Sequence, residues 1–426
     1  MRRGIAASAL VAALAVSLAA CGSSGSSSST AANGPVTITY WDTSNATNEA
    51  PTYQDVAKKF EAANPNIKVN FVNVPFDSAQ NKLQTAMGSK GAPDVFRSDV
   101  GWTAAFAKAG YLTPLDGTPA LADSAAFQPS LLKQASYQGK TYGVPLVTDT
   151  LGLLYNKALF AKAGITAAPT TWDALKADAA TVKAKTGVDG FEMRAGDGYY
   201  AMPLLFGEGT DMVNAAAKKI TVNSPQAAAA VETYKSLFTS PGTVKADLTS
   251  DGYAHMMDAF NTGKVAAIIN GPWEITNIYQ GSAFTDKANL GIAAVPAGSA
   301  GKPGAPTGGH NIDVYAGSDA AHQAAAEKFA AFMTSAASQT EIAQKNSTLP
   351  TRSDAYTPAL TADPGIAGFQ AILPVAQPRP ELPEYSSLFT SIGTNLGKIL
   401  QNQESTQAGL DATASDYAKL LPDFTK

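Results

Sequence analysis

The sequence predicts an α/β protein in which short strands and helices alternate along the chain. Residues 36–41 alternate β-branched and aromatic side chains, as strands do, and residues 67–72 alternate in the same way. Between them, residues 53–63 carry apolar side chains at helical spacing. This strand–helix–strand order predicts a right-handed βαβ unit with parallel strands.

The same alternation continues along the chain, without an internal repeat. Helices are expected near residues 78–87, 104–109, 172–185, 227–238, 320–335 and 387–400. Strands are expected near residues 93–96, 152–155, 265–270 and 291–295. One helix start has a clear signal, because Thr171 is a good N-cap residue and Trp172 can pack under the first turn.

Length and charge narrow the class of protein. A chain of 426 residues exceeds what one hydrophobic core usually supports, so two domains or lobes are expected. The chain has 31 Lys and Arg and 35 Asp and Glu, but two of the basic residues, Arg2 and Arg3, precede residue 21. Residues 21–426 therefore carry 29 basic and 35 acidic side chains, a net charge of −6. This mild acidity argues against a nucleic-acid partner. With three scattered His and one Cys, neither a zinc site nor a cofactor is expected.

The N-terminus has the layout of an export signal. Arg2 and Arg3 precede an apolar run over residues 5–18, which is too short to span a bilayer comfortably, and small residues lead to Cys21. Residues 1–20 are therefore predicted to be a signal peptide. Cys21, the only cysteine, resembles the cysteine of the bacterial lipobox, which is diacylated and becomes the mature N-terminus. The alternative is an ordinary secreted protein in which Cys21 is incidental.

A tether follows the signal. Residues 21–35 begin with this lipidated Cys and continue as a Gly/Ser-rich linker, which would behave as a flexible coil. No later segment has the roughly 18 consecutive apolar residues that a spanning helix needs. The mature protein is therefore expected outside the cytoplasm, held at the cell membrane only by its lipid anchor.

Beyond the linker, a series of short motifs runs in order through the chain. Each motif alone is weak, but together they resemble the extracellular solute-binding proteins of ABC importers. Within that family they are most similar to the sugar-binding branch, which includes maltose- and maltodextrin-binding proteins. The motifs are Ile38–Trp41, Val56–Glu61, Pro93–Phe96, Tyr142–Pro145, Leu153–Lys157, Pro169–Asp173, Gly263–Glu274, Thr307–Gly309 and Leu349–Arg352.

The resemblance implies a two-lobed, periplasmic-binding-protein-like (Venus-flytrap) fold. In such a fold a hinge joins two α/β lobes, and the chain crosses between them more than once. By carry-over, the crossings fall near residues 149–151, 303–308 and 352–355. The N-terminal lobe would hold residues 36–148 and 309–351, and the C-terminal lobe residues 152–304 and 356–426.

A sugar cleft needs aromatic platforms for the C–H faces of the rings and polar or charged groups for the hydroxyls. Trp273 follows Gly271 and Pro272 at the end of an apolar strand, where the chain turns. In the family, this Trp stacks under a sugar ring and Glu274 lies beside it. The alternative for Trp273 is a core residue that covers the end of the strand.

Further candidates follow two predicted strands. Asp99 and Trp102 come after the strand near residues 93–96, and Trp41 and Asp42 end the strand near residues 36–41. Ligands of open α/β folds lie beyond the carboxyl ends of strands, so these side chains are expected at the cleft. Trp41 is as compatible with core packing as with ligand contact.

The resemblance adds candidates from the crossings and the second lobe. Asp149 would bind a hydroxyl at the first crossing, or else cap a helix or form a hinge ion pair. Tyr199 would stack or donate its hydroxyl, or else only pack. The other candidates are Asp197 in the same acidic–aromatic loop, Gly308 and Gly309 for close backbone approach or hinge bending, and Arg379 and Tyr385 as late contacts.

The resemblance therefore implies a non-enzymatic receptor that closes on an oligosaccharide, expected to be maltose or a maltodextrin, and presents it to ABC permease subunits. One alternative keeps the fold and changes the cargo to trehalose, another oligosaccharide or a polyol. Another is a secreted glycoside hydrolase, which also uses paired carboxylates and aromatic platforms. A monomer is expected, and the chain has no phosphate-binding Gly-x-x-x-x-Gly-Lys-Ser/Thr sequence.

Overall fold

The computed structural model describes residues 34–426. The predicted signal peptide, Cys21 and nearly all of the predicted linker lie outside the described residues. Residues 35–426 form one compact unit. No helix in the described part of the chain is long and apolar enough to cross a membrane.

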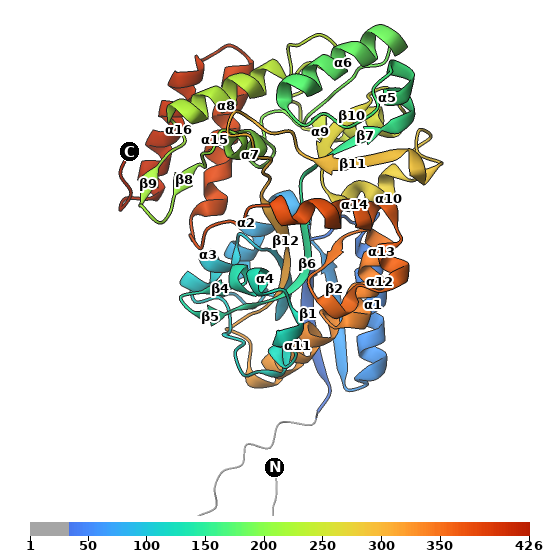
Figure 1. The fold of residues 1–426 in the computed structure, drawn as a ribbon. Helices are drawn as coiled ribbons and strands as arrows, with labels where there is room; N and C mark the ends of the chain where they lie inside the picture. The colour runs from blue at the N-terminus through green and yellow to red at the C-terminus, as the bar shows by residue number, and fades with distance from the viewer. Residues whose placement is uncertain (1–33) are drawn as a thin grey trace, which may run out of the picture. The chain divides into compact units, whose positions relative to one another are not determined.

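Two main sheets organise this unit (Figure 1). The six-stranded sheet has the order β13 (Leu349–Pro350), β6 (Gly143–Thr150), β12 (Thr307–Val314), β3 (Val95–Asp99), β1 (Val36–Asp42) and β2 (Ile67–Asn73). The three-stranded sheet has the order β10 (Ala267–Asn270), β7 (Gly152–Asn156) and β11 (Leu290–Ala294). Two ribbons complete the strands, β4 (Ser136–Tyr137) with β5 (Lys140–Thr141) and β8 (Val213–Asn214) with β9 (Lys219–Ile220).

Helices cover these sheets, and the expected ones are all present with ends shifted by a few residues. They are α1 (Ala50–Ala63), α2 (Phe76–Ala86), α3 (Thr103–Lys108), α4 (Pro129–Gln134), α5 (Lys157–Ala163), α6 (Trp172–Thr186), α7 (Gly198–Gly207), α8 (Pro225–Ser236), α9 (Gly252–Asn261), α10 (Ile275–Ile278), α11 (Ala320–Met333), α12 (Ala336–Asn346), α13 (Pro358–Thr361), α14 (Pro364–Ile372), α15 (Tyr385–Leu400) and α16 (Thr406–Leu420). Single 3₁₀ turns are η1 (Pro119–Leu121), η2 (Ser124–Ala126), η3 (Pro272–Glu274), η4 (Lys287–Asn289), η5 (Ser353–Ala355) and η6 (Leu373–Val375).

The first predicted unit is confirmed. β1 and β2 pair in parallel over their whole length, and α1 connects them. The helix start at Thr171 is also confirmed, because its side chain accepts a hydrogen bond from the Ala174 backbone N–H and Trp172 is buried. Strong local patterns thus gave correct local structure.

Other elements differ from the expectation. The strand expected at residues 93–96 runs over Val95–Asp99, so Asp99 ends the strand and does not lie in a following loop. The segment expected to be an acidic–aromatic loop is the start of helix α7, which Asp197 caps through its carboxylate. β6 and β12 were not expected as strands, although they form the longest ladder between two strands far apart in the sequence.

The chain passes between the two sheets at short connections. β6 ends at Thr150 in the six-stranded sheet, and β7 begins at Gly152 in the three-stranded sheet. The chain returns between β11 and β12, and after β13 it reaches α14, which packs on β11. Figure 1 shows β6 and β12 side by side where the two groups of elements meet. The lobe boundaries given above stay predictions.

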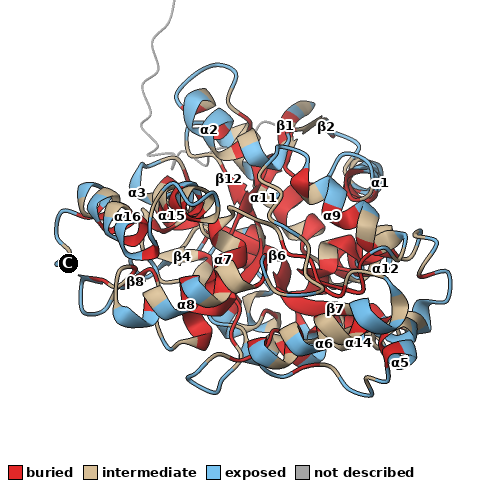
Figure 2. Cartoon of the chain, turned by 90° about the horizontal axis from the view of Figure 1, so that it is seen from above, coloured by how far each residue is buried: buried red, intermediate tan, exposed pale blue. Residues whose placement is uncertain are grey.

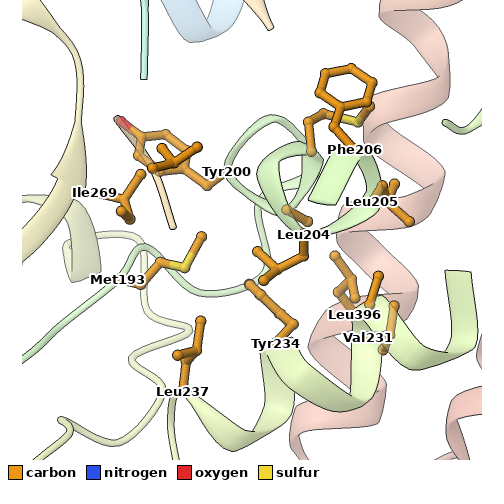
Figure 3. Close-up of a cluster of buried hydrophobic side chains, with 14 of the residues drawn as sticks. Met193, Tyr200, Leu204, Leu205, Phe206, Val231, Tyr234, Leu237, Ile269 and Leu396 are labelled. Atoms are coloured by element: carbon orange, nitrogen blue, oxygen red, sulfur yellow. The ribbon is translucent and has the colours of Figure 1, made fainter. Parts of the chain in front are cut away.

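Apolar side chains fill the space between each sheet and its helices. The strands near the middle are buried while the outer faces of helices such as α2 and α6 are exposed (Figure 2). In one core cluster, α7, α8 and α15 meet (Figure 3), and the contributing side chains include Leu204, Leu205, Val231, Tyr234 and Leu396. This packing holds α7 and the start of α15 firmly, and both carry candidate site residues.

Candidate functional site

A buried pair of opposite charges joins β3 to the segment before α15. Arg379 donates from Nη1 to Asp99 Oδ1 at 2.6 Å, and its Nε donates to the Thr307 carbonyl at 3.2 Å. Its guanidinium lies 5.3 Å from the centroid of the Tyr199 ring, a cation–π arrangement. Three predicted site residues are therefore in one contact group, although 280 positions separate Asp99 from Arg379 in the sequence.

Asp149 lies beside this group without a hydrogen-bond donor of its own. It is 5% exposed, and no side chain among the described residues donates to its carboxylate. Burial raises the pKa of Asp149 to about 7, although the positive charge of Arg379 acts in the opposite direction. A largely buried carboxylate without a protein donor is able to accept a hydrogen bond from a ligand hydroxyl.

Gly308 faces Asp149 across the β6–β12 ladder. A Cβ at Gly308 would collide with Asp149 Oδ1 and would lie 2.8 Å from the hydroxyl of Tyr199. Only glycine leaves room for both groups at this point. Its neighbour Gly309 has a φ of +127°, and a Cβ there would collide with the Val147 carbonyl, so this position also requires glycine.

Trp273 belongs to a second network, after β10. Its indole Nε1 donates to the hydroxyl of Tyr253 at 3.0 Å, and that hydroxyl donates to Glu274 Oε1 at 2.8 Å. The half-buried indole folds back over Gly271, where a Cβ would collide with the ring. Burial raises the pKa of Glu274, and hydrogen bonds from Asn277 and Tyr253 partly oppose this. The network fixes the orientation of the indole.

A third group lies at the carboxyl end of β1. Asp42 is fully buried and accepts hydrogen bonds from the Ser44 backbone N–H, the Ser44 hydroxyl, Asn73 and Tyr40. Burial raises the pKa of Asp42, while the charge of nearby Arg97 acts to lower it. The oxygens of Asp42 are largely occupied, so its main effect in this structure is to hold the Ser44 segment and Asn73.

An aromatic surface is formed by Phe76, which the sequence analysis did not select. Phe76 is 44% exposed and stacks on Trp102 with ring centroids 5.4 Å apart, while Trp102 itself is 5% exposed and packs in the core. The ring of His310 stands at 75° to the ring of Phe76, with centroids 5.7 Å apart. The ring face available to a ligand here is therefore that of Phe76, with Trp102 as its support.

His310 is a further polar group that sequence reasoning missed. Its side-chain nitrogens are both buried, and neither has a hydrogen-bond partner within residues 34–426. Burial and the charges of Arg97 and Arg379 lower its pKa well below the ordinary value. A neutral imidazole with one free donor and one free acceptor can bind a hydroxyl from either side.

The remaining predicted residues have other surroundings. Asp197 caps α7, with its Oδ1 accepting from the Tyr199 backbone N–H at 2.8 Å and its Oδ2 paired with Arg194 at 3.1 Å. Trp41 is half-buried against the cluster around Trp102. Tyr385 is buried in the core cluster that contains α7, α8 and α15, and its hydroxyl donates to Asp211 at 3.1 Å. Its ring packs against Phe389, which also contacts the ring of Tyr199.

Groups from the two sheets lie within electrostatic reach of one another. The charge of Glu274, after β10, helps to raise the pKa of Glu49, which precedes α1 and is shifted mainly by its own burial. The charge of Asp77 in α2 acts on Arg194 before α7. Charged side chains attached to one sheet therefore act on charged side chains attached to the other. Residues 34–426 contain no group of three or more His, Cys, Asp or Glu side chains placed to hold a metal ion.

A family model described as bacterial extracellular solute-binding protein matches residues 44–340. The chain belongs to this family. The diacetylchitobiose-binding protein DasA of Streptomyces coelicolor is 30% identical over 399 residues, which cover 91% of each chain. The putative binding proteins of Brucella abortus and Brucella suis are also 30% identical, over 87% of this chain and 90% of theirs.

Solved structures agree on the two-lobed fold. The GacH receptor of Streptomyces glaucescens, determined without ligand and with acarbose, has a TM-score of 0.87 and 42% identity, covering 92% of this chain and 99% of that one. The cyclic α-maltosyl-1,6-maltose-binding protein of Arthrobacter globiformis has a TM-score of 0.74 and 26% identity, covering 92% and 100%. The expected two-lobed fold and family are thereby confirmed. The named relatives are binding proteins and receptors. Because the family consists of extracellular solute-binding proteins, this chain acts outside the cytoplasm.

Proposed function

We propose that this protein is the receptor of an ABC importer for an oligosaccharide of the maltose and maltodextrin class. It captures the sugar between its lobes and presents it to the permease subunits. The similarity to a receptor crystallised with acarbose and to a protein that binds a maltosyl-maltose supports this cargo class. The similarity to DasA makes an N-acetylated disaccharide the main competing cargo.

The observation that carries this proposal is the set of groups around Asp149. A buried carboxylate without a donor lies beside the Asp99–Arg379 pair and the ring of Tyr199. A sugar hydroxyl can donate to Asp149 and accept from Arg379, while the ring stacks on an aromatic face. Rejection of the wrong sugar follows because an unpaired buried polar group costs about 1–3 kcal/mol.

Two aromatic faces, on elements attached to different sheets, extend the site for a longer cargo. Phe76 presents an exposed ring face on the six-stranded lobe, and Trp273 presents a half-buried indole on the other lobe. Aromatic side chains of this kind suit the C–H faces of successive rings. We therefore expect more than one sugar unit to be bound.

Closure follows from the distribution of these groups over two lobes. Sugar bound to one lobe gains the contacts of the other only when the lobes approach, so cargo shifts the population toward the closed form. The closed form is then the one that the permease recognises. Capture and presentation of the sugar therefore need no chemical step on this chain.

The test is a binding screen with product analysis. We expect maltose, maltotriose or longer maltodextrins to raise the melting temperature, since a ligand that binds only the folded state adds about 2.7 kcal/mol at 100 times its Kd. Calorimetry should then show one saturable heat and chromatography should recover the sugar unchanged. Binding only to diacetylchitobiose, trehalose or a polyol would refute the cargo, and shortened products would identify a hydrolase.

We also propose that Cys21 carries the lipid that holds the mature protein at the membrane. Cys21→Ala should abolish acylation, so the protein should move from the membrane fraction to the soluble exported fraction in cells grown with labelled palmitate. Labelling of the native chain is the control. A variant that stays membrane-bound would contradict this anchor.

A further inference from the structure

A cavity of about 600 Å³ is lined by none of the charged or aromatic candidates described above. This volume is within the roughly 300–1,000 Å³ of small-molecule sites. One wall is α4, which packs against β6, and the other is formed by the end of α14 and η6, where α14 packs on β11. Elements attached to both sheets therefore line it.

The cavity is on the opposite side of the β6–β12 ladder from Asp149. The side of Gly308 that would bear a Cβ faces Asp149, and Thr307, the residue before it in β12, lines the cavity. Successive residues of a strand point to opposite faces of the sheet. The two spaces are thus separated by the strands through which the chain passes between the lobes.

The lining has the chemistry of a site for a neutral, hydroxyl-bearing molecule. Three glutamines (Gln128, Gln134 and Gln370) and four hydroxyl residues (Ser130, Thr307, Ser353 and Tyr356) are among its lining residues, none of which carries a charge at neutral pH. Both polar atoms of the Gln134 amide are buried and have no hydrogen-bond partner within the described residues. An orphaned donor next to an orphaned acceptor matches a hydroxyl, which can accept from one and donate to the other.

The cavity is also connected to the cargo site by one residue. Thr307 lines the cavity, its backbone N–H donates to the Gln377 carbonyl at 2.8 Å, and its carbonyl accepts from Arg379 Nε at 3.2 Å. Arg379 is the partner of Asp99. A molecule bound between α4 and η6 therefore acts on the segment that positions this ion pair.

We propose that this cavity is a second carbohydrate site, which takes one neutral sugar ring and raises the affinity of the cleft for its cargo. The ring contacts walls attached to both sheets, so it binds one arrangement of the lobes more tightly than others. That arrangement is the one in which Arg379 is held on Asp99. Because coupling is reciprocal, cargo in the cleft also tightens binding in the cavity.

The direct test observes the glutamine amides. Protein labelled with ¹⁵N at glutamine is titrated with glucose, and the Gln134 signal is assigned by its loss in Gln134→Leu. We expect saturable shifts of Gln134 and of Gln128 and Gln370, and at least tenfold weaker glucose binding at this site in Gln134→Leu. Gln54→Leu, an exposed change on α1, should leave the titration unaltered. A Gln134 signal that does not move, or equal binding by Gln134→Leu, would overturn the site.

Two further measurements define the ligand and the coupling. Glucuronate should bind at least tenfold more weakly than glucose, because the cavity offers no positive charge to a carboxylate; equal binding would overturn the neutral class. At saturating glucose, cargo affinity in the native protein should exceed that in Gln134→Leu by about fivefold, and equal affinities would refute the coupling. Glucose can also compete with the cargo for the cleft. Because it does so equally in both proteins, measuring both at the same glucose concentration removes this competition from the ratio of their cargo affinities. Gln370→Leu, at an exposed position, is the second variant should Gln134→Leu fail to fold.

Discussion

Asp149→Asn should make the ligand-free protein more stable at neutral and alkaline pH. The pKa of Asp149 is raised from 3.8 to about 7 by burial, so at pH 8 the native state holds a buried charge that the unfolded chain exposes to water. The folded state binds the extra proton between about pH 4 and 7, and the free energy of unfolding therefore falls as pH rises through this window. Asparagine at position 149 carries no charge, so the variant does not lose this part of its free energy of unfolding as the pH rises.

The size of the effect follows from the two pKa values. At about 1.36 kcal/mol for each pKa unit, the difference between 3.8 and about 7 corresponds to about 4 kcal/mol. This is an upper limit, because the amide introduced by the substitution would donate to a space shaped for an acceptor and would no longer attract Arg379. The gain in Asp149→Asn should be greatest at pH 8 and small at pH 4.

The assay is urea unfolding of the native chain and the variant between pH 4 and pH 8. The difference between the two removes the contribution of other buried acids, such as Asp313, whose pKa burial also raises to about 7. Asp173→Asn is the matched control, because its carboxylate is 91% exposed and exposed charge pairs contribute about 0–1 kcal/mol. A difference that does not change with pH, or a variant less stable at pH 8, would refute the reasoning.

Three other results are expected. A sugar hydroxyl that donates to Asp149 favours the carboxylate, so cargo affinity should rise with pH through about 7, and Asp149→Asn should remove this rise in calorimetry. Trp273→Ala should weaken cargo binding by about 1–3 kcal/mol in fluorescence titrations, with a smaller loss of ligand-free stability since the indole is half-exposed; a variant that unfolds but binds normally when folded would make Trp273 a core residue. Phe76→Ala should weaken binding of long oligosaccharides more than of maltose, and an equal loss for both would exclude an outer platform.

Local sequence patterns determined the elements that were predicted correctly. The first strand, α1 and β2 each carry their own signal, namely alternation or helical spacing bounded by a Pro or Asn turn. The cap at Thr171 has the same local origin. Such elements need no information about distant parts of the chain, and their order already implied a parallel pair.

The elements that were missed depend on distant partners. β6 is buried along its whole length and contains Pro145 and Asp149, while β12 begins with Thr307 and two glycines, so both resemble loops in sequence. They are strands because they pair with each other, and β12 also pairs with β3. The helix α7 was missed for a similar reason, since Pro203 lies inside it and its apolar residues cover all sides.

The same distinction between local and distant information applies to the candidate site. The residue types were predictable, because acidic and aromatic side chains at strand ends suit a sugar. Their partners were not: Asp99 finds Arg379 from the far end of the chain, and Trp102 supports Phe76, which is the ring left exposed. Sequence reasoning also had no means to find His310, whose two free nitrogens become visible only once its burial is known.

Gly308 shows how the structure decides between interpretations that the sequence leaves open. In the sequence, Gly308 is compatible with a bend, a close ligand approach or a flexible hinge. In the structure its missing Cβ is what leaves space for Asp149 Oδ1 and the Tyr199 hydroxyl on one side of the ladder. Its neighbour Thr307 faces the cavity on the other side and accepts from Arg379. A side chain at position 308 would therefore displace the Asp149 carboxylate and the Tyr199 hydroxyl from the positions that they occupy beside the Asp99–Arg379 pair.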